Sequence, residues 1–177
     1  MKLLNSLTAI SLLFWSGCSV LIGHVKPEEV KSIDSKIIDV SQIDPSWKKI
    51  SIGPTSGPSE DIPDGAWQST KTASVISINS ACRQGSDEDN DLKSVTQTLL
   101  SQWNNLKILN ERELTVSNYP ALETTAEGYY LSRNRKFQTV AVKSPMCVYD
   151  LIYLSPVKTF DQELSVFQKF RDNLILK

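Results

Sequence analysis

Cys18 is the residue whose sequence context predicts the most specific chemistry. It follows Lys2, an apolar stretch that reaches Trp15, and two small residues. This order is typical of a bacterial signal peptide that ends in a lipobox-like cleavage site. We therefore expect residues 1–17 to be removed and the Cys18 thiol to carry lipid, because two acyl chains are enough for stable membrane anchoring.

Two other interpretations of the Cys18 region stay open. The segment could be an ordinary signal peptide cut elsewhere or a retained membrane anchor, and Trp15 is unusual at its lipobox position. A membrane-spanning helix needs about 20 apolar residues. The stretch before Cys18 is shorter and is interrupted by the polar residues Asn5, Ser6, Thr8 and Ser11. The lipoprotein interpretation is therefore preferred.

Cys82 and Cys147 are the two cysteines that are left when Cys18 carries lipid. In an exported protein, an even pair of cysteines predicts a disulfide. The bond would close a loop of 64 intervening residues. In the chain-entropy model it would stabilise the domain by about 4 kcal/mol. A metal site is the alternative, but it needs more ligands than two thiols.

The predicted domain lacks the residue types that common enzyme mechanisms need. His24 is the only histidine, and it lies in a segment that we expect to be a tether. A Ser-His-Asp triad, a Cys-His pair and a histidine metal ligand are thus excluded from the domain. We expect a chain that is not an enzyme and that uses no cofactor or metal.

Acidic residues form two weak patterns. Residues 87–91 alternate carboxylates like the start of an EF-hand loop, but Leu92 stands where that loop needs glycine and Thr98 where it needs glutamate. Glu123 and Glu127 would share a strand face, yet four strand residues span about 13 Å. A glycosidase pair is separated by only about 5–9.5 Å. We therefore interpret the acidic run as a helix cap and neither pattern as a site.

The charge of the chain is close to neutral. The net charge is −1 for the whole chain, and the loss of Lys2 makes it −2. Proteins that bind nucleic acid carry a basic footprint, which is missing here. The basic cluster at 133–136 is best explained as a hairpin loop between two strands.

Glu111 and Glu113 are a closer pair of carboxylates than Glu123 and Glu127. They flank Arg112 on a strand that we expect to be exposed, so we do not interpret them as a catalytic pair.

Tyr149 and Tyr153 are the candidates for a ligand cleft. They alternate with Cys147 and Leu151, so all four side chains share one face of a predicted strand. Core packing is the simpler explanation. Alternatively, the two rings line a cleft beneath a helix, because tyrosine brings a polar tip to an apolar wall.

Composition divides the chain into three parts. We expect residues 1–17 to be the signal peptide, residues 18–45 a flexible tether, and residues 46–177 a single domain. The tether changes from apolar to charged and polar and has no sustained hydrophobic period. The domain is long enough to bury a hydrophobic core of its own.

Periodicity in the domain predicts strands and two helices. Apolar residues at helical spacing predict helices over 92–106 and 160–174. Alternation and turn residues predict strands over 47–52, 66–68, 72–79, 107–116, 121–131, 136–143 and 147–154. Short turns join most of these strands, so we expect an α+β fold, an antiparallel sheet flanked by two main helices. If the strands next to Cys82 and Cys147 are antiparallel neighbours, the two thiols meet at one edge of the sheet.

From Thr72 onward, the layout resembles a known superfamily. The segments that carry the resemblance are Val75–Asn79, the helix over 92–106, Tyr119–Ala121, Val148–Leu154 and Phe167–Arg171. A late strand that feeds a helix with an aromatic-x-x-Phe-Arg ending resembles the PsbP-like superfamily, which includes photosystem extrinsic proteins, DcrB-like bacterial lipoproteins and the Ran-binding Mog proteins. The stretch Asn79–Cys82, taken with Cys147, is also similar to a set of uncharacterised proteobacterial lipoproteins.

The resemblance implies an α/β/α sandwich in families that mostly bind or scaffold. It carries over no functional residue, because the superfamily has no shared active site.

Together these features predict a lipid-anchored protein of the cell envelope whose domain works by binding. The leading hypothesis is an interaction or assembly module with an envelope protein as its partner; the alternative is a carrier of a small ligand or lipid for an envelope transport system. Ser19, after Cys18, is not the acidic residue that retains enteric lipoproteins in the inner membrane. In a Gram-negative cell we therefore expect the outer membrane, with the domain facing the periplasm.

Overall fold

The computed structural model describes residues 37–51, 63–82, 91–101, 103–130 and 133–176. The signal peptide, Cys18, His24 and most of the acidic run at 87–91 lie outside the described residues. Within the described residues, no helix has the length and apolar character that a membrane crossing requires.

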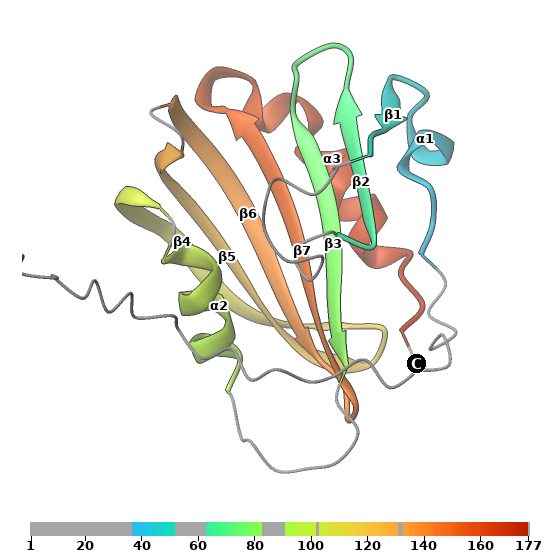
Figure 1. Cartoon of the computed structure of the whole chain (residues 1–177), viewed down its shortest axis with the longest axis vertical. Helices are drawn as coiled ribbons and strands as arrows, with labels where there is room; N and C mark the ends of the chain where they lie inside the picture. Colours follow the sequence, from blue (N-terminus) through green and yellow to red (C-terminus); the bar gives the residue numbers. More distant parts are fainter. Residues whose placement is uncertain (1–36, 52–62, 83–90, 102, 131–132, 177) are drawn as a thin grey trace, which may run out of the picture.

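Seven antiparallel strands form one sheet (Figure 1). Their order across the sheet is β1-β2-β3-β7-β6-β5-β4, so β1 and β4 are the edge strands. The strands are β1 Trp47–Lys49, β2 Gly65–Ser69, β3 Val75–Cys82, β4 Asn104–Val116, β5 Tyr119–Tyr130, β6 Arg133–Lys143 and β7 Cys147–Pro156. The predicted α+β class with an antiparallel sheet is confirmed.

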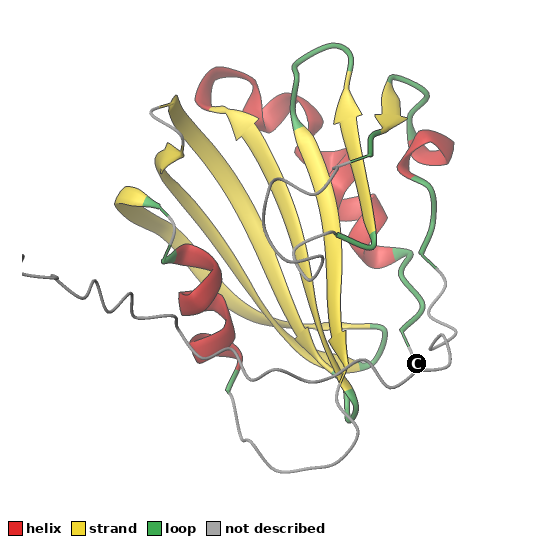
Figure 2. Ribbon diagram, in the orientation of Figure 1, coloured by secondary structure: helices red, strands yellow, loops and turns green. Residues whose placement is uncertain are grey.

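Helices cover both faces of the sheet (Figure 2). Helix α3, Phe160–Asp172, packs against β7 on one face and follows a short 3₁₀ helix, Val157–Thr159. Helix α1, Val40–Ile43, packs against α3. Helix α2, Leu92–Leu100, lies on the opposite face against β5 and β6. The arrangement is the α/β/α sandwich that the resemblance implied.

The face toward α3 holds the larger core. The ring of Trp67 in β2 lies 5.4 Å from that of Phe170, and the ring of Tyr153 in β7 lies 5.7 Å from that of Phe167, measured between centroids. Trp47 of β1 lies 6.4 Å from Tyr153 on the same face. Burial of such side chains contributes about 1.5–3 kcal/mol each. Aromatic packing, more than helix propensity, therefore holds α3 on the sheet.

The face toward α2 has a smaller core. Leu100 from α2, Ala126 from β5 and Phe137 from β6 are buried there. Trp103 stacks on Phe137 with their ring centroids 4.0 Å apart. Because this cluster is small, α2 depends on few apolar contacts for its position.

The predicted helix over 92–106 is wrong in its second half. Helix α2 ends at Leu100, and Leu106 lies in β4. Asn105 has a φ of 51°, in the left-handed region, which does not continue a right-handed helix. Trp103 and Leu106 still pack on the α2 core. Their burial on that face explains why they match the helical period without being helical.

The domain begins before the expected boundary at residue 46. Val40 of α1 is fully buried in the core against α3. The Asp39 carboxylate caps α1 and also accepts a hydrogen bond from the indole N–H of Trp67 at 2.9 Å. Residues 37–45 therefore belong to the domain and not to the tether. A four-residue helix has no sustained period, so the sequence pattern did not reveal it.

The cap at α2 is the one expected from the acidic run, whereas α3 begins without a side-chain cap. The Asp91 carboxylate accepts a hydrogen bond from the backbone N–H of Ser94 at 2.7 Å. Thr159 makes no such cap; its hydroxyl instead donates to the carbonyl of Pro156 at 3.2 Å. The start of α3 is fixed by tertiary contacts rather than by a local cap.

Strand β5 begins at Tyr119, two residues before its predicted start, so the hairpin between β4 and β5 has a two-residue turn. Ser117 and Asn118 have φ values of 52° and 69°. Two consecutive positive φ angles are typical of a type I′ turn, which suits a two-residue hairpin loop. Pro120 lies in β5 opposite Thr115, before Ala121 begins the pairing with β6. At that position its missing N–H breaks no bond to β6.

Candidate functional site

A tight polar turn joins β2 to β3 beside the first turn of α3. The N–H of Ser69 donates to the carbonyl of Ser74 at 2.9 Å, and its carbonyl accepts from the N–H of Ala73 at 3.2 Å. Ala73 has a φ of 58°. Residues other than glycine seldom adopt this left-handed conformation, because Cβ crowds the following carbonyl. The turn is therefore held in a strained conformation.

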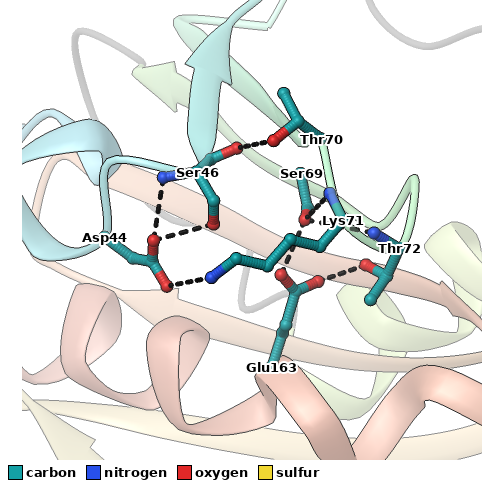
Figure 3. A network of polar contacts seen from close by, with 7 residues as sticks. All are labelled: Asp44, Ser46, Ser69, Thr70, Lys71, Thr72 and Glu163. Atoms are coloured by element: carbon teal, nitrogen blue, oxygen red, sulfur yellow. Dashed lines mark hydrogen bonds and ion pairs between the residues drawn. The ribbon is translucent and has the colours of Figure 1, made fainter.

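Glu163 of α3 binds this turn from inside the molecule. One carboxylate oxygen accepts from the Ser69 hydroxyl at 2.6 Å, and the other accepts from the Thr72 hydroxyl (Figure 3). Glu163 is only 5% exposed. A buried carboxylate is costly unless it is hydrogen-bonded, and here both oxygens have donors. Glu163 therefore ties the helix to the turn.

An ion pair lies on the outer side of the same turn. The Lys71 ammonium is 3.6 Å from the Asp44 carboxylate (Figure 3). Asp44 also accepts from the backbone N–H and the hydroxyl of Ser46, and these bonds are the main reason that the pKa of Asp44 lies below its ordinary value. The Lys71 side chain is 62% exposed. Such a surface pair contributes less than about 1 kcal/mol.

A hollow of about 320 Å³ lies between α1, this turn and α3. Its charged lining consists of Lys71 and Lys169 against Asp44 and Glu163, so the charges balance. The volume is at the lower limit of small-molecule sites, which measure about 300–1,000 Å³. The space fits a few water molecules or a small polar molecule. Both lining carboxylates already have donors or a cation, so neither is free to act as a general base.

The other candidate carboxylates are also engaged. Glu123 of β5 accepts from Arg112 at 2.6 Å and from Arg171 at 2.5 Å. Glu127 accepts from the side-chain amide of Asn134 at 3.0 Å. In the part of the chain that the structure describes, no group of three or more His, Cys, Asp or Glu side chains could hold a metal ion.

Tyr149 and Tyr153 lie in the core and not along a cleft. They are 2% and 0% exposed and face α3. The hydroxyl of Tyr153 donates to the carbonyl of Phe160 at 2.9 Å, and burial raises the pKa of Tyr153. Neither ring lines the hollow beside α3. The structure places both tyrosines where the simpler interpretation, core packing, puts them.

Cys82 and Cys147 form a disulfide. They are directly opposite in the pairing of β3 with β7, at the last residue of one strand and the first of the other. Strand β3 extends three residues beyond its predicted end at Asn79, so Cys82 lies within the strand. The bond therefore closes the end of the central strand pair.

The sequence interpretation missed the role of Glu163. The sequence does contain a sign of this role. Glu163 is a charged residue on the apolar stripe of the helix, three residues after Phe160 and four before Phe167. Arg171, four residues after Phe167, gives the same signal and meets Glu123. Charged residues at core positions of an amphipathic helix predict buried polar partners.

Among the described residues, three of the exposed large apolar side chains lie on the β4–β5 hairpin, and the other two are Met146 and Ile175. Ile108 and Leu109 of β4 are 51% and 43% exposed, and Tyr129 of β5 is 44% exposed. All three lie in the half of the hairpin away from its turn. Ile108 lies opposite Ala126 on the face toward α2, whereas Tyr129, three residues after Ala126, lies on the other face, so this hairpin leaves apolar groups in water on both of its faces.

Comparison with solved structures supports the fold. LpqN of Mycobacterium tuberculosis, described as involved in cell envelope biogenesis, matches with a TM-score of 0.58 and 13% identity over 75% of this chain and 79% of LpqN. The PsbP protein of Synechocystis sp. PCC 6803, CyanoP, matches with a TM-score of 0.51 and 8% identity over 75% of this chain and 82% of CyanoP. The PsbP-like fold is thereby confirmed.

A third match adds no weight. PA94 of Pseudomonas aeruginosa, a protein of unknown function, has a TM-score of 0.48 and 14% identity over 75% of this chain and 83% of PA94. The sequence matches no protein-family model and no curated protein. Since all three identities are low, the likeness concerns the fold alone.

Proposed function

We propose that this chain is a lipid-anchored cell-envelope protein whose domain binds another protein and does not catalyse a reaction. The sequence around Cys18 supports the anchor, because an apolar segment and two small residues precede the thiol. The likeness to LpqN, a protein involved in cell envelope biogenesis, supports the compartment. The resemblance to PsbP-like families, which mostly bind or scaffold, supports the role.

The observation that carries the binding role is the exposed β4–β5 hairpin. Every residue from Lys107 to Glu113 is exposed, and Ile108 and Leu109 are apolar. By contrast, the rings of Tyr149 and Tyr153 are packed in the core. A surface that leaves apolar groups in water while the interior is filled is better suited to a protein partner than to an enclosed ligand.

The hydrogen bonds of two buried carboxylates support the non-catalytic part of the proposal. Glu123 and Glu163 are buried, and their oxygens accept hydrogen bonds from side chains of the same domain. General acid or base catalysis needs a group that can reach a substrate proton. These two carboxylates are used instead to join α3 to the sheet and to the β2–β3 turn.

A second candidate, a carrier of a small ligand, is favoured by the hollow beside α3. Its volume of about 320 Å³ and its lining by Lys71, Lys169 and Glu163 would suit a small polar molecule. A lipid acyl chain fits this lining less well, because burying charged groups against an apolar chain is unfavourable.

Native mass spectrometry distinguishes the two functions. The sample is the mature chain with Cys18→Ser, purified gently from the periplasm so that a ligand is kept. We expect the bare chain mass less two hydrogens for the disulfide. A reproducible additional mass of metabolite or lipid size would instead establish the carrier and reject the protein-binding role as the main function.

Membrane fractionation tests the anchor separately. The full chain with Cys18→Ala should leave the membrane fraction, because it has no thiol to acylate. Ser19→Ala is the matched control and should stay membrane-bound. If Cys18→Ala remains in the membrane fraction, the lipoprotein assignment is wrong.

A further inference from the structure

Strand β4 offers an open edge for another strand. It is last in the order of the sheet, and in the described part of the chain it pairs only with β5. All seven residues of Lys107–Glu113 are exposed, so no described element covers either of its faces there. An edge of this kind presents unpaired backbone N–H and C=O groups.

The two halves of β4 differ in regularity. The pairing with β5 shifts register between Asn104 and Lys107 and again between Ile108 and Asn110. Such bulges disrupt a strand and blunt its edge. From Asn110 to Val116 the register with β5 is unbroken. This run matches the length of an ordinary strand, so it is the part of the edge that can accept one.

Within the described part of the chain, the regular run Asn110–Val116 carries two unpaired negative charges and one positive charge that is already paired. Glu111 and Glu113 lie opposite Thr124 and Leu122 of β5, on the face of the sheet that α2 also occupies. In the described residues neither carboxylate has an ion-pair or hydrogen-bond partner. Arg112, on the other face, is already bound to Glu123. The edge therefore presents two carboxylates about 7 Å apart and no free cation beside them.

A second copy of this chain is a poor partner for the run. When two identical edges pair antiparallel about a two-fold axis, residues on the same face come opposite each other. The pairing that uses the whole run Asn110–Val116 is centred on Glu113 and places this carboxylate opposite its own copy, and the neighbouring register, centred on Arg112, places Glu111 opposite Glu113. Like charges directly opposite each other are destabilising.

We propose that Asn110–Val116 of β4 accepts, as an additional strand, an extended segment of another protein that carries lysine or arginine at alternate positions. Backbone hydrogen bonds along the edge would supply affinity, and two cations opposite Glu111 and Glu113 would supply selectivity. This inference rests on the protein-binding function proposed above and names the chemistry of the partner.

The test uses synthetic peptides and hydrogen exchange at low ionic strength, where charge pairing is least screened. The protein is the mature chain with Cys18→Ser. One peptide alternates lysine and valine, the second alternates glutamate and valine, and the third is the lysine peptide with the backbone N–H of each lysine methylated, because the residues opposite Glu111 and Glu113 are those that bond to the edge. The third keeps the charge but cannot pair as a strand. We expect only the first to slow the exchange of amides in Asn110–Val116, by about tenfold at millimolar peptide.

Charge reversal tests the selectivity. Glu113→Lys should abolish the protection by the lysine peptide, whereas Asp161→Lys, the same change on exposed α3, should keep it. Equal protection by the lysine and glutamate peptides, or none by the lysine peptide, would overturn the inference. Protection of these amides that rises with protein concentration alone would show self-pairing and would also overturn it.

The two proposals fail separately. A bare chain mass in native mass spectrometry with no peptide protection leaves the protein-binding function in place and rejects the basic partner at β4. A bound ligand in native mass spectrometry rejects the function itself, whatever the peptides do.

Discussion

Glu123 of β5 and Arg171 of α3 form a buried ion pair, with 2.5 Å between Oε2 and Nη1. The Glu123 side chain is 2% exposed and that of Arg171 is 10% exposed. The second carboxylate oxygen accepts from Arg112 of β4 at 2.6 Å. Glu123 thus joins the last helix to two strands at the edge of the sheet. It lies opposite Val140 of β6, so the ion pair is a second buried polar contact on the side of α3, in addition to that of Glu163 with Ser69.

Replacing Glu123 by glutamine should lower the free energy of unfolding by about 3 kcal/mol. The substitution keeps the shape but removes the buried counter-charge of Arg171 and leaves only the exposed Asp172 carboxylate, 2.7 Å from its Nε; losing one partner of a buried pair typically costs about 3–5 kcal/mol. Urea denaturation followed by circular dichroism measures the change. Glu113→Gln, an exposed residue on β4, is the control and should change stability by less than about 0.5 kcal/mol.

A double substitution checks the electrostatic cause of that loss. Glu123→Leu with Arg171→Leu removes both charges, and buried pairs replaced by apolar residues often regain stability. We expect the double variant to be more stable than Glu123→Gln. If the double variant and Glu123→Gln are equally unstable, packing and not the loss of the buried counter-charge of Arg171 is the cause.

Loss of the disulfide should lower stability by about 4 kcal/mol. The cysteines are 65 positions apart, and the chain-entropy model gives this value for a loop of that size. Urea denaturation compares the double variant, in which both Cys82 and Cys147 are replaced by alanine, with the oxidised wild-type protein. Because both cysteines lie in paired strands, the variant should keep the circular dichroism spectrum of the sheet.

Thiol labelling decides whether the bond is present in the purified protein. In denatured, unreduced chain with Cys18→Ser, neither Cys82 nor Cys147 should react. If both cysteines react, the purified protein has no disulfide, and the predicted loss of about 4 kcal/mol in the alanine variant no longer applies.

Asp150 should make the protein less stable as pH rises from about 4 to 7. Its carboxyl on β7 is mostly removed from water, and this desolvation raises its pKa to about 6. The folded state therefore keeps a proton that the unfolded chain, with a pKa near 3.8, has already released. Below about pH 4 both states are protonated and no penalty applies. Above about pH 6 the full penalty applies, about 2 to 3 kcal/mol.

The variant Asp150→Asn isolates this contribution. The stability of wild type minus that of the variant should fall between pH 4 and 7 and then stay level. Asp91→Asn is the control, because the hydrogen bond from Ser94 lowers the pKa of Asp91 below its ordinary value of 3.8, so its contribution stays level between pH 4 and 7 and is lost only at lower pH. A difference for Asp150 that rises with pH would contradict the assignment.

The sequence predicted those elements whose apolar period is long and uninterrupted. Helix α3 and strand β7 each bury one complete stripe or face, so periodicity located them, whereas β6 is buried on both faces from Phe137 to Val142 and was located by the turn residues on either side of it. The end of α2 was misplaced because Trp103 and Leu106 bury on the same core without being helical. The spacing of apolar residues shows which side chains are buried on the same side of the molecule. It does not by itself show whether the backbone between them is helical.

The candidate site could not be predicted in the same way. The hollow is lined by α1, the β2–β3 turn and α3, three segments far apart in the sequence. Helix α1 is too short to show a period, and Glu163 is recognisable only as a charge in an apolar stripe. The open edge of β4 also depends on sheet order, which places the fourth strand of the chain last. Local patterns carry none of this long-range arrangement.

The strained turn beside Glu163 gives a prediction of increased stability. Ala73 is exposed and has a φ of 58°, a conformation that costs an L-residue about 1–2 kcal/mol. Glycine adopts it without strain but loses about 0.5–1 kcal/mol more chain entropy on folding. The balance favours Ala73→Gly by about 0.5 to 1 kcal/mol.

Ala81→Gly is the matched control for this turn. Ala81 is also exposed but lies in the extended strand β3, where glycine brings only the entropy loss, so this variant should be less stable by about 0.5–1 kcal/mol. Urea midpoints of the two variants should therefore move in opposite directions. If both move downward, the hydrogen bonds from Ser69 and Thr72 to Glu163 depend on the conformation that Ala73 imposes on the turn. The left-handed conformation would then be held at a cost because it positions those donors.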